Sequence, residues 1–394
     1  MLKKIITGLL LIILILICFI FKLIKQDSNG VHISEIAKKI GTETIINVEE
    51  QGADSTGFSD STKYFQKAID SLGKSGGVIF IPKGTFLLDQ IQIPSYVQLV
   101  GSGKGTILKS KPNSDKPLIV LKSKTAQMVY LRDFTIDGNR EYQSSSKARG
   151  IEFINTRSAE EMKKKSILKE HDARHYIENI YISETKGDGL YIEGRGESQI
   201  KGLQVLRSDG IGIHSNAQDN WFTDCSSGES GVYGIFVGDA ATNSRYVNCK
   251  AWFSGRVNSD QGDGFHITAS RVALTGSEAQ DNSKHGFVFA GSDIVGYGLL
   301  AEANGWQYGT RIRREDGTGF VFYGAINCNI QGVAADRFVD SKEKSHQAFA
   351  IQLLNQSRGN HIDVTSRGMR LNTIPSDQLN DNNKINITEN KEEN

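Results

Sequence analysis

Five residues in the middle of the chain have side chains that could move protons or hold a cation during a reaction. Each stands close to the glycine of a repeated phrase, and they are Asp209, Tyr233, Asp263, His266 and His285. Carboxyl groups act as acid and base in glycoside hydrolysis. A base of the His or Tyr type, working with a cation, can instead remove the proton next to a uronate carboxyl. These residues therefore indicate acid–base chemistry on a sugar polymer.

Five further residues are candidates for binding such a substrate: Tyr191, His214, Phe236, Arg256 and Arg311. Aromatic side chains present apolar faces to sugar rings, and the guanidinium fork of arginine matches the two oxygens of a uronate carboxyl. We expect Asp263 to be the acid–base or cation-positioning group, with His285 or Tyr233 as its proton-transfer partner. An Asp-Gly step is also common in turns, so a structural role is the alternative for each aspartate.

These residues belong to a phrase that returns along the chain: a small or polar residue, a glycine, and then an apolar–any–apolar triplet. We align its glycines, with spacings of 21, 24, 30, 22 and 33 residues, as Gly189, Gly210, Gly234, Gly264, Gly286 and Gly319. A repeat of this length is typical of a solenoid, and the alternation predicts a short strand with one buried face. No segment of helix length separates the strands, which argues against an α/β sheet or barrel.

Strands that stack about 4.8 Å apart, coil after coil, make a parallel β-helix, so we predict an all-β solenoid. A leucine-rich horseshoe is the alternative, but the repeat lacks its leucine pattern. Equivalent positions then form rows on the surface, and we expect the substrate groove to cross the coils that carry the five candidate catalytic residues. Phe265, Phe287 and Phe320 share one inward position and should stack in the core.

The composition excludes several other classes of protein. The 394 residues include 41 glycines and 5 prolines, and the formal net charge is +1. A near-neutral chain lacks the basic surface of a nucleic-acid-binding protein. Cys225, Cys249 and Cys328 stand at inward repeat positions, where we expect small buried side chains rather than disulfides. No Cys/His spacing fits a zinc site, and the one cofactor left open is a calcium ion, if the reaction is that of a lyase.

The ends of the chain differ from the repeat. Residues 5–24 are an apolar run between lysines, and residues 1–25 predict an uncleaved signal anchor that crosses a cell membrane once, with the rest of the chain outside the cytoplasm. A cleaved signal peptide, and hence a secreted protein, is the alternative. The remaining boundaries are a linker with a short helix at 26–44, the β-helix at 45–368 with a charged insertion at 157–174, and a disordered tail at 369–394.

A solenoid needs a cap over the apolar end of its first coil, and an amphipathic helix over residues 62–72 is predicted to form it. Gly52-Ala53-Asp54 stands before this helix, and after it comes a strand and turn, residues 76–86, of the sequence Gly-Gly-Val-Ile-Phe-Ile-Pro-Lys-Gly-Thr-Phe. This order resembles the N-terminal cap of the pectate-lyase-like superfamily. That group includes polygalacturonases, rhamnogalacturonan-acting enzymes and phage tailspike depolymerases.

The resemblance covers about residues 45–370. It implies a single-stranded right-handed parallel β-helix with an N-terminal capping helix, and a polysaccharide as partner. Asp263-Gly264, Lys284-His285-Gly286 and Arg311-Ile312-Arg313 also follow the order of polygalacturonase motifs, which implies catalytic roles for Asp263 and His285. The Asp-Asp-Cys motif of that family is absent, and Tyr233 replaces an aspartate on the preceding coil, so the carboxylate set of an inverting hydrolase is incomplete.

Three functions remain open at this point. The first is a membrane-anchored, extracytoplasmic lyase or glycoside hydrolase that acts on an acidic, uronate-containing polysaccharide. The second is a C5-epimerase acting on a cell-surface glycan, because elimination and epimerisation begin with the same proton abstraction. The third is a noncatalytic glycan-binding β-helix, for which Asp, Tyr and His clustered on neighbouring coils would not be needed. The oligomeric state is not predicted.

Overall fold

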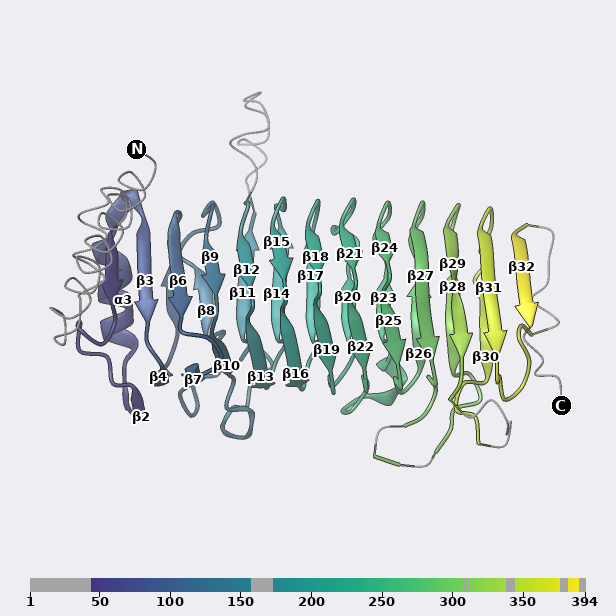
Figure 1. Cartoon of the computed structure of the whole chain (residues 1–394), viewed down its shortest axis with the longest axis horizontal. Helices are drawn as coiled ribbons and strands as arrows, with labels where there is room; N and C mark the ends of the chain where they lie inside the picture. The colour runs from purple at the N-terminus through teal and green to yellow at the C-terminus, as the bar shows by residue number, and fades with distance from the viewer. Residues whose placement is uncertain are drawn as a thin grey trace, which may run out of the picture. The chain divides into compact units, whose positions relative to one another are not determined.

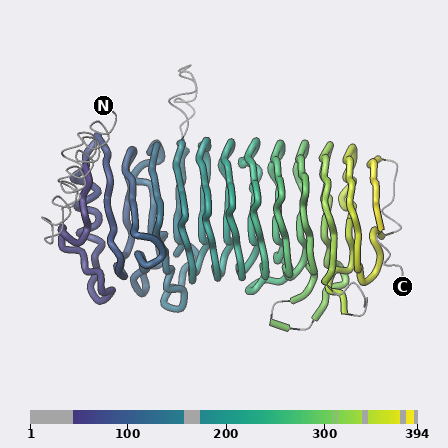
Figure 2. Tube along the Cα trace, in the orientation of Figure 1, coloured from purple at the N-terminus to yellow at the C-terminus, as the bar shows by residue number. Residues whose placement is uncertain are grey.

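The computed structural model describes residues 44–156, 173–307, 309–310, 312–337, 344–375 and 382–389 (Figures 1 and 2). The chain divides into two compact units, Met1–Ile46 and Asn47–Asn394. Strand β1 (Ile45–Asn47) lies at this division, and the second unit contains all the other described elements. The predicted anchor and nearly all of the predicted linker and charged insertion fall outside the described residues. Within those residues, no helix is long and apolar enough to cross a membrane.

The second unit is a right-handed parallel β-helix, as the sequence predicts, and its coils follow one another in chain order (Figure 1). Sheet B takes one strand from each coil, and every strand pairs in parallel with that of the next coil. Its ten strands are β5 (Ile91–Ile93), β8 (Ile119–Leu121), β11 (Ile151–Asn155), β14 (Leu190–Gly194), β17 (Ile213–Ala217), β20 (Ile235–Val237), β23 (Phe265–Ile267), β26 (His285–Phe289), β28 (Thr318–Tyr323) and β30 (Phe349–Leu354).

Sheet A forms the rest of the wall, and most coils give it two strands that meet at a bend. The first strands are β3 (Gly77–Ile81), β6 (Val97–Gly101), β9 (Tyr130–Arg132), β12 (Tyr176–Glu178), β15 (Gln199–Lys201), β18 (Trp221–Thr223), β21 (Arg245–Val247) and β24 (Ala273–Thr275). The second strands are β2 (Thr56–Asp60), β4 (Gly84–Leu88), β7 (Thr106–Ser110), β10 (Thr135–Asp137), β13 (Tyr181–Thr185), β16 (Gln204–Ser208), β19 (Ser226–Gly228), β22 (Lys250–Trp252) and β25 (Glu278–Gln280).

One longer strand replaces both in the last coils: β27 (Val295–Glu302), β29 (Asn329–Ala335), β31 (His361–Arg367) and β32 (Lys384–Glu389). Strand β32 pairs in parallel with β31, with Ile385 opposite Ile362. The β-helix therefore continues beyond residue 368, and our prediction of a disordered tail was wrong for residues 384–389. The alternating Lys-Ile-Asn-Ile-Thr-Glu of this strand is a period-2 pattern that its polar composition concealed.

The core confirms the predicted aromatic ladder. Phe265, Phe287 and Phe320 lie opposite one another on β23, β26 and β28, and all three are fully buried. Their ring centroids are 4.8 Å and 5.5 Å apart and the rings are nearly parallel. In earlier coils the same inward position is held by aliphatic side chains, such as Ile213 and Ile235.

The N-terminal end of this unit carries the predicted cap. Helix α3 (Thr62–Ser71) is followed by a 3-10 turn (Gly73–Ser75), and it buries Phe65, Ala68 and Ile69 against the first coil. The Phe65 ring meets the edge of Phe86 in β4 at 5.4 Å. An amphipathic helix thus covers the apolar end of the solenoid, as the sequence predicts.

The turns that lead from sheet A to sheet B, which we call the A–B corners, differ in length along the molecule. The corner between β13 and β14 is short, since β13 ends at Thr185 and β14 begins at Leu190. Long corners join β10 to β11, β22 to β23 and β27 to β28, and the first two contain short 3-10 helices at Arg140–Tyr142 and Ser259–Gln261. The long corners lie along the lower edge in Figure 1.

Candidate functional site

The outer face of sheet B carries a row of ring side chains at equivalent positions of four consecutive coils. The row consists of Tyr191, His214, Phe236 and His266. Neighbouring ring centroids are 4.7 Å, 5.1 Å and 5.7 Å apart in that order. The fold thus brings together three of the candidate binding residues and one candidate catalytic residue.

The register of one coil differs from our alignment. Gly212, rather than Gly210, is equivalent to Gly189 and Gly234: its carbonyl accepts the Leu190 N–H at 3.0 Å, and its own N–H donates to the Tyr233 carbonyl at 3.2 Å. This shift by two residues brings His214 into the ring row. It also removes Asp209 from the positions that directly precede the repeat glycines, so Asp209 and Asp263 do not occupy equivalent positions of their coils.

Asp263, His266 and Tyr233 form a tight group at one end of the ring row. The carboxyl of Asp263, which is 3% exposed, lies with Oδ2 2.8 Å from Nδ1 of His266. Tyr233 comes from the preceding A–B corner, and its ring stacks on that of His266 with centroids 4.5 Å apart. Burial, with a contribution from Asp263, raises the pKa of Tyr233 to about 12. The phenol is therefore protonated at neutral pH and can donate a proton.

His285 lies behind this group on the next coil. Its backbone N–H donates to Oδ1 of Asp263 at 3.3 Å, and its ring is buried. Burial lowers the pKa of the imidazole to about 4, although Asp263 acts in the opposite direction. His285 is thus neutral at ordinary pH, and it completes the packing around Asp263 rather than reaching the surface.

Charged residues from two corners border the same group. Lys284 precedes β26, and its backbone N–H donates to the Gly262 carbonyl beside Asp263 at 3.1 Å. Arg314 and Asp316 come from the long corner between β27 and β28, where Nε of Arg314 lies 2.8 Å from Oδ1 of Asp316. Burial opposes ionisation of Asp316, but the hydrogen bond from Arg314 lowers the pKa of this carboxyl below its usual value.

A second Asp–His pair lies at the other end of the ring row. Oδ2 of Asp188 is 3.1 Å from Nδ1 of His214, on the next coil, and 3.3 Å from Nε of Arg149. The Arg149 guanidinium lies 4.0 Å from the ring centre of Tyr191. Burial, and then a hydrogen bond from the hydroxyl to Glu193, raise the pKa of Tyr191. Two ends of one row thus carry the same residue types in different surroundings.

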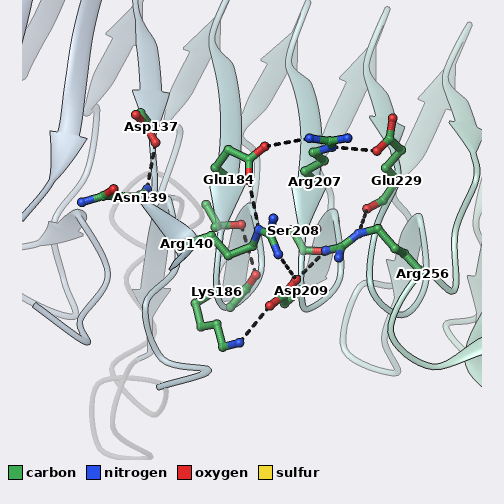
Figure 3. Close-up of polar contacts among 12 residues, drawn as sticks. Asp137, Asn139, Arg140, Glu184, Lys186, Arg207, Ser208, Asp209, Glu229 and Arg256 are labelled. Atoms are coloured by element: carbon green, nitrogen blue, oxygen red, sulfur yellow. Dashed lines mark hydrogen bonds and ion pairs between the residues drawn. The ribbon is translucent and has the colours of Figure 1, made fainter. Parts of the chain in front are cut away.

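Asp209 lies away from the row, in a network of ion pairs at the A–B corners (Figure 3). Its carboxyl accepts from Arg256 at 2.5 Å, from Lys186 at 3.0 Å and from Arg140 at 3.3 Å. Burial opposes ionisation, but hydrogen bonds from Arg256 and Lys186 lower the pKa of Asp209. Arg256 also donates to the carbonyls of Ser208 and Glu229. The arginine expected to clamp a uronate is therefore bound to Asp209, and Arg311 is outside the described residues.

Comparison with known proteins agrees with this architecture. Residues 45–236 match the family model described as "Rhamnogalacturonase A/epimerase, pectate lyase-like". These matched residues belong to the pectate-lyase-like superfamily of parallel β-helices. It is 26% identical over 268 residues to the pre-neck appendage protein of Bacillus phage B103, a match that covers 66% of this chain and 28% of that protein. The chain spans about a quarter of the length of the phage appendage proteins that it matches.

Two solved structures show the fold of this pectate-lyase-like chain. The enzymatically active domain of tailspike protein 2 from bacteriophage CBA120 has a TM-score of 0.67 at 18% identity, covering 82% of this chain and 47% of that one. The A-module of a mannuronan C-5 epimerase from Azotobacter vinelandii has a TM-score of 0.56 at 15% identity, covering 86% and 99%. The curated relatives are pre-neck appendage proteins of phages, and this finding contradicts our prediction of a single-pass cell-membrane protein.

The sequence missed several residues of this candidate site. Asp188, Arg149 and Glu193 contact the ring row, but their partners lie on other coils or in a corner, so only the correct register could reveal them. Lys284 was visible as part of the Lys-His-Gly motif. Among the described residues, no cluster of three or more His, Cys, Asp or Glu could hold a metal ion.

Proposed function

We propose that this protein is a polysaccharide-cleaving enzyme, and specifically a lyase that acts on a uronate-containing glycan. The observation that carries the proposal is the group on the outer face of sheet B: a tyrosine ring stacked at 4.5 Å on a histidine whose Nδ1 is held at 2.8 Å by a buried aspartate. Solved relatives of the same fold include an enzymatically active tailspike domain and a C-5 epimerase module, which supports a polysaccharide as substrate.

His266 is the proposed base. Because its Nδ1 is bonded to Asp263, the tautomer with hydrogen on Nδ1 is favoured and Nε2 keeps its lone pair. This is the arrangement by which a carboxyl orients an imidazole base. Nε2 then removes the proton next to the uronate carboxyl of the bound sugar.

Tyr233 is the proposed acid. Its pKa of about 12 keeps the hydroxyl protonated, and the stacking on His266 brings it to the same sugar unit. It donates a proton to the glycosidic oxygen as that bond breaks, which leaves an unsaturated sugar at the new chain end. The proton that His266 gained is lost to solvent, and Tyr233 is reprotonated from solvent.

Removal of a proton next to a carboxylate requires that the charge of that carboxylate be balanced. Lys284 is the proposed partner, because it lies at the corner beside Asp263 and is partly exposed. Arg256 and Arg314 are less suitable, since each is already bonded to an aspartate within the protein.

Hydrolysis receives less support from the same geometry. An inverting or retaining hydrolase needs a carboxylic acid that stays protonated near neutral pH. The pKa values of Asp209 and Asp316 are lowered by cationic partners, and Asp263 is bonded to an imidazole. Among the described carboxyls, those of Asp281 and Glu302 have raised pKa values. Asp281 follows β25 and Glu302 ends β27, so both lie at the ends of sheet A strands and not on the outer face of sheet B.

C5-epimerisation is the second candidate, since it starts with the same proton abstraction. The test is incubation with a panel of uronate polymers, with three readouts: ultraviolet absorbance of unsaturated ends, new reducing ends, and deuterium exchange at C5. Unsaturated ends on at least one polymer are expected. Reducing ends without unsaturation would assign a hydrolase, exchange without cleavage an epimerase, and binding without any reaction a glycan-binding protein, and each of these results would overturn the lyase proposal.

A further inference from the structure

The outer face of sheet A carries a second row of ring and long polar side chains, on a different sheet from the proposed catalytic group. Strand pairing places Tyr176 opposite Gln199, Gln199 opposite Trp221, and Trp221 opposite Arg245. Lys201 stands two residues after Gln199 on β15 and so lies on the same face. We call Tyr176, Gln199, Lys201, Trp221 and Arg245 the sheet A binding face.

The rings of this face contact side chains of neighbouring coils and are also partly exposed to solvent. Tyr176 stacks on Tyr130 of the preceding coil, with centroids 4.8 Å apart, and the Arg245 guanidinium lies 5.9 Å from the ring centre of Trp221. Both rings are partly exposed, while Gln199 and Arg245 are exposed. Rings held by neighbouring coils lose little side-chain entropy when they bind a ligand.

The cations of this face differ from those of the A–B corners. Arg140, Lys186 and Arg256 share the carboxyl of Asp209. In the part of the chain that the structure describes, by contrast, neither Lys201 nor Arg245 has a carboxylate within ion-pair distance. Both therefore remain available to an anion from outside the protein.

The composition and spacing of the face fit an extended acidic glycan. Partly exposed rings suit the apolar faces of sugars, an exposed amide suits hydroxyl groups, and the two cations suit carboxylates. One side chain per coil, about 4.8 Å apart, makes a line along the axis of the β-helix. A polymer lying on that line meets Lys201 and Arg245 at the same time, which a compact ligand does not.

We propose that the sheet A binding face holds a second segment of an acidic polysaccharide, away from the residues that cleave it. The class of ligand rests on the proposed function, but the face itself contains none of the proposed catalytic residues. Its role is to keep the polymer on the protein between cleavage events.

The test measures binding in the full chain carrying His266→Gln, so that the polymer is not consumed. Affinity electrophoresis against polygalacturonate and alginate, with a neutral glucan and duplex DNA for comparison, gives apparent dissociation constants. Trp221→Ala and Arg245→Ala should each weaken binding to an acidic polymer about 5- to 10-fold. The matched controls are Tyr297→Ala, an exposed ring on β27, and Arg271→Ala, an exposed cation in the turn before β24, and both should leave binding unchanged. Added salt should weaken polymer binding by the His266→Gln chain more than polymer binding by the same chain with Arg245→Ala.

Unchanged affinity in Trp221→Ala and Arg245→Ala, with melting temperatures like that of the parent, overturns the proposal. So does an absence of binding to both acidic polymers, or tighter Trp221-dependent binding of the glucan or the DNA. Failure of the proposed function gives a different result. The wild-type chain then makes no unsaturated product, while Trp221-dependent binding of an acidic polymer persists. That result would contradict the lyase proposal and would support the sheet A binding face.

Discussion

The two Asp–His pairs on the outer face of sheet B consist of the same residue types in different surroundings. Asp188 reaches across to His214 on the next coil at 3.1 Å, whereas Asp263 holds His266 of its own coil at 2.8 Å. Asp188 is also the ion-pair partner of Arg149. Asp263 has no such cation within ion-pair distance among the described residues, and its carboxyl also accepts the backbone N–H of His285.

We propose that this difference separates a binding role from a catalytic one. A carboxyl that is shared with a guanidinium orients an imidazole less strictly than one whose only side-chain partner is the imidazole. The ring next to His214 is Tyr191, whose hydroxyl donates to Glu193. The ring next to His266 is Tyr233, whose hydroxyl has no hydrogen bond to any residue that the structure describes. We therefore propose that the Asp263 pair transfers protons and that the Asp188 pair binds sugar.

The largest expected difference between the pairs concerns their tyrosines. Tyr233→Phe removes the proposed proton donor, so kcat should fall about 10²–10⁴-fold. Tyr191→Phe removes a hydroxyl that already bonds Glu193, so kcat should stay within a few-fold of the wild type. Initial rates of unsaturated-product formation check both. Equal losses in the two variants would show that the row does not divide in this way.

The core beneath the two pairs should also respond differently. Phe287→Ala leaves a cavity between Phe265 and Phe320 and should reduce the free energy of unfolding by about 3–5 kcal/mol. Ile213→Val, beneath His214, removes one buried methylene and should reduce it by about 0.5–1.5 kcal/mol. Urea unfolding followed by circular dichroism measures both. A near-zero cost for Phe287→Ala would contradict the inward assignment of this position.

Two aspartates of the A–B corners should differ in how much they stabilise the fold. Asp209→Ala leaves Arg140, Lys186 and Arg256 close together without their shared carboxyl, and should destabilise the fold by roughly 2–3 kcal/mol after allowance for their partial exposure. Asp260→Ala removes a carboxyl that is 78% exposed and should cost less than about 0.5 kcal/mol. Melting temperatures compare the two. A larger loss for Asp260→Ala would mean that the long corners, rather than the ion network, hold this edge together.

The smallest expected effect concerns the buried imidazoles in the two halves of the molecule. Burial lowers the pKa of His175 to about 3 and that of His285 to about 4. Both are neutral in the folded protein, while in the unfolded chain they bind a proton below about pH 6.5. Their contribution to stability is complete above that pH and is lost as the pH falls towards 4 and 3.

Lowering the pH from 7 to 5.5 should therefore reduce the free energy of unfolding by about 1 kcal/mol for each imidazole. His175→Phe and His285→Phe should each flatten this pH dependence, whatever their effect on stability at pH 7. Denaturant unfolding at several pH values measures the slope. A slope that neither variant changes would mean that these histidines are not buried in solution.

The sequence was sufficient for the fold because the glycine phrase and the alternation depend on local chemistry. It was insufficient for the register of one coil. Ile211-Gly212-Ile213 repeats the phrase of Asp209-Gly210-Ile211, and a shift by two residues leaves every side chain on the same face of the strand. Apolar periodicity therefore cannot distinguish the two alignments, and the backbone hydrogen bonds of Gly212 decide between them.

Part of the site was predictable because it follows from the local pattern of the glycine phrase. Phe236 and His266 share one position after their glycines, and the structure places them side by side. The Asp188–His214 pair and the capture of Arg256 by Asp209 depend on contacts between coils, which a single sequence does not encode locally. The spacings of 30 and 33 residues revealed that two coils are long, but not that the additional residues lie at the A–B corners.

The most direct test of the central claim compares His266→Gln with His214→Gln on the polymer that the wild type cleaves. Glutamine keeps hydrogen-bonding capacity but cannot serve as the base. We predict that His266→Gln lowers kcat about 10²–10⁴-fold with little change in KM, and that His214→Gln raises KM with kcat close to that of the wild type. A loss of kcat in His214→Gln with His266→Gln still active would contradict the assignment.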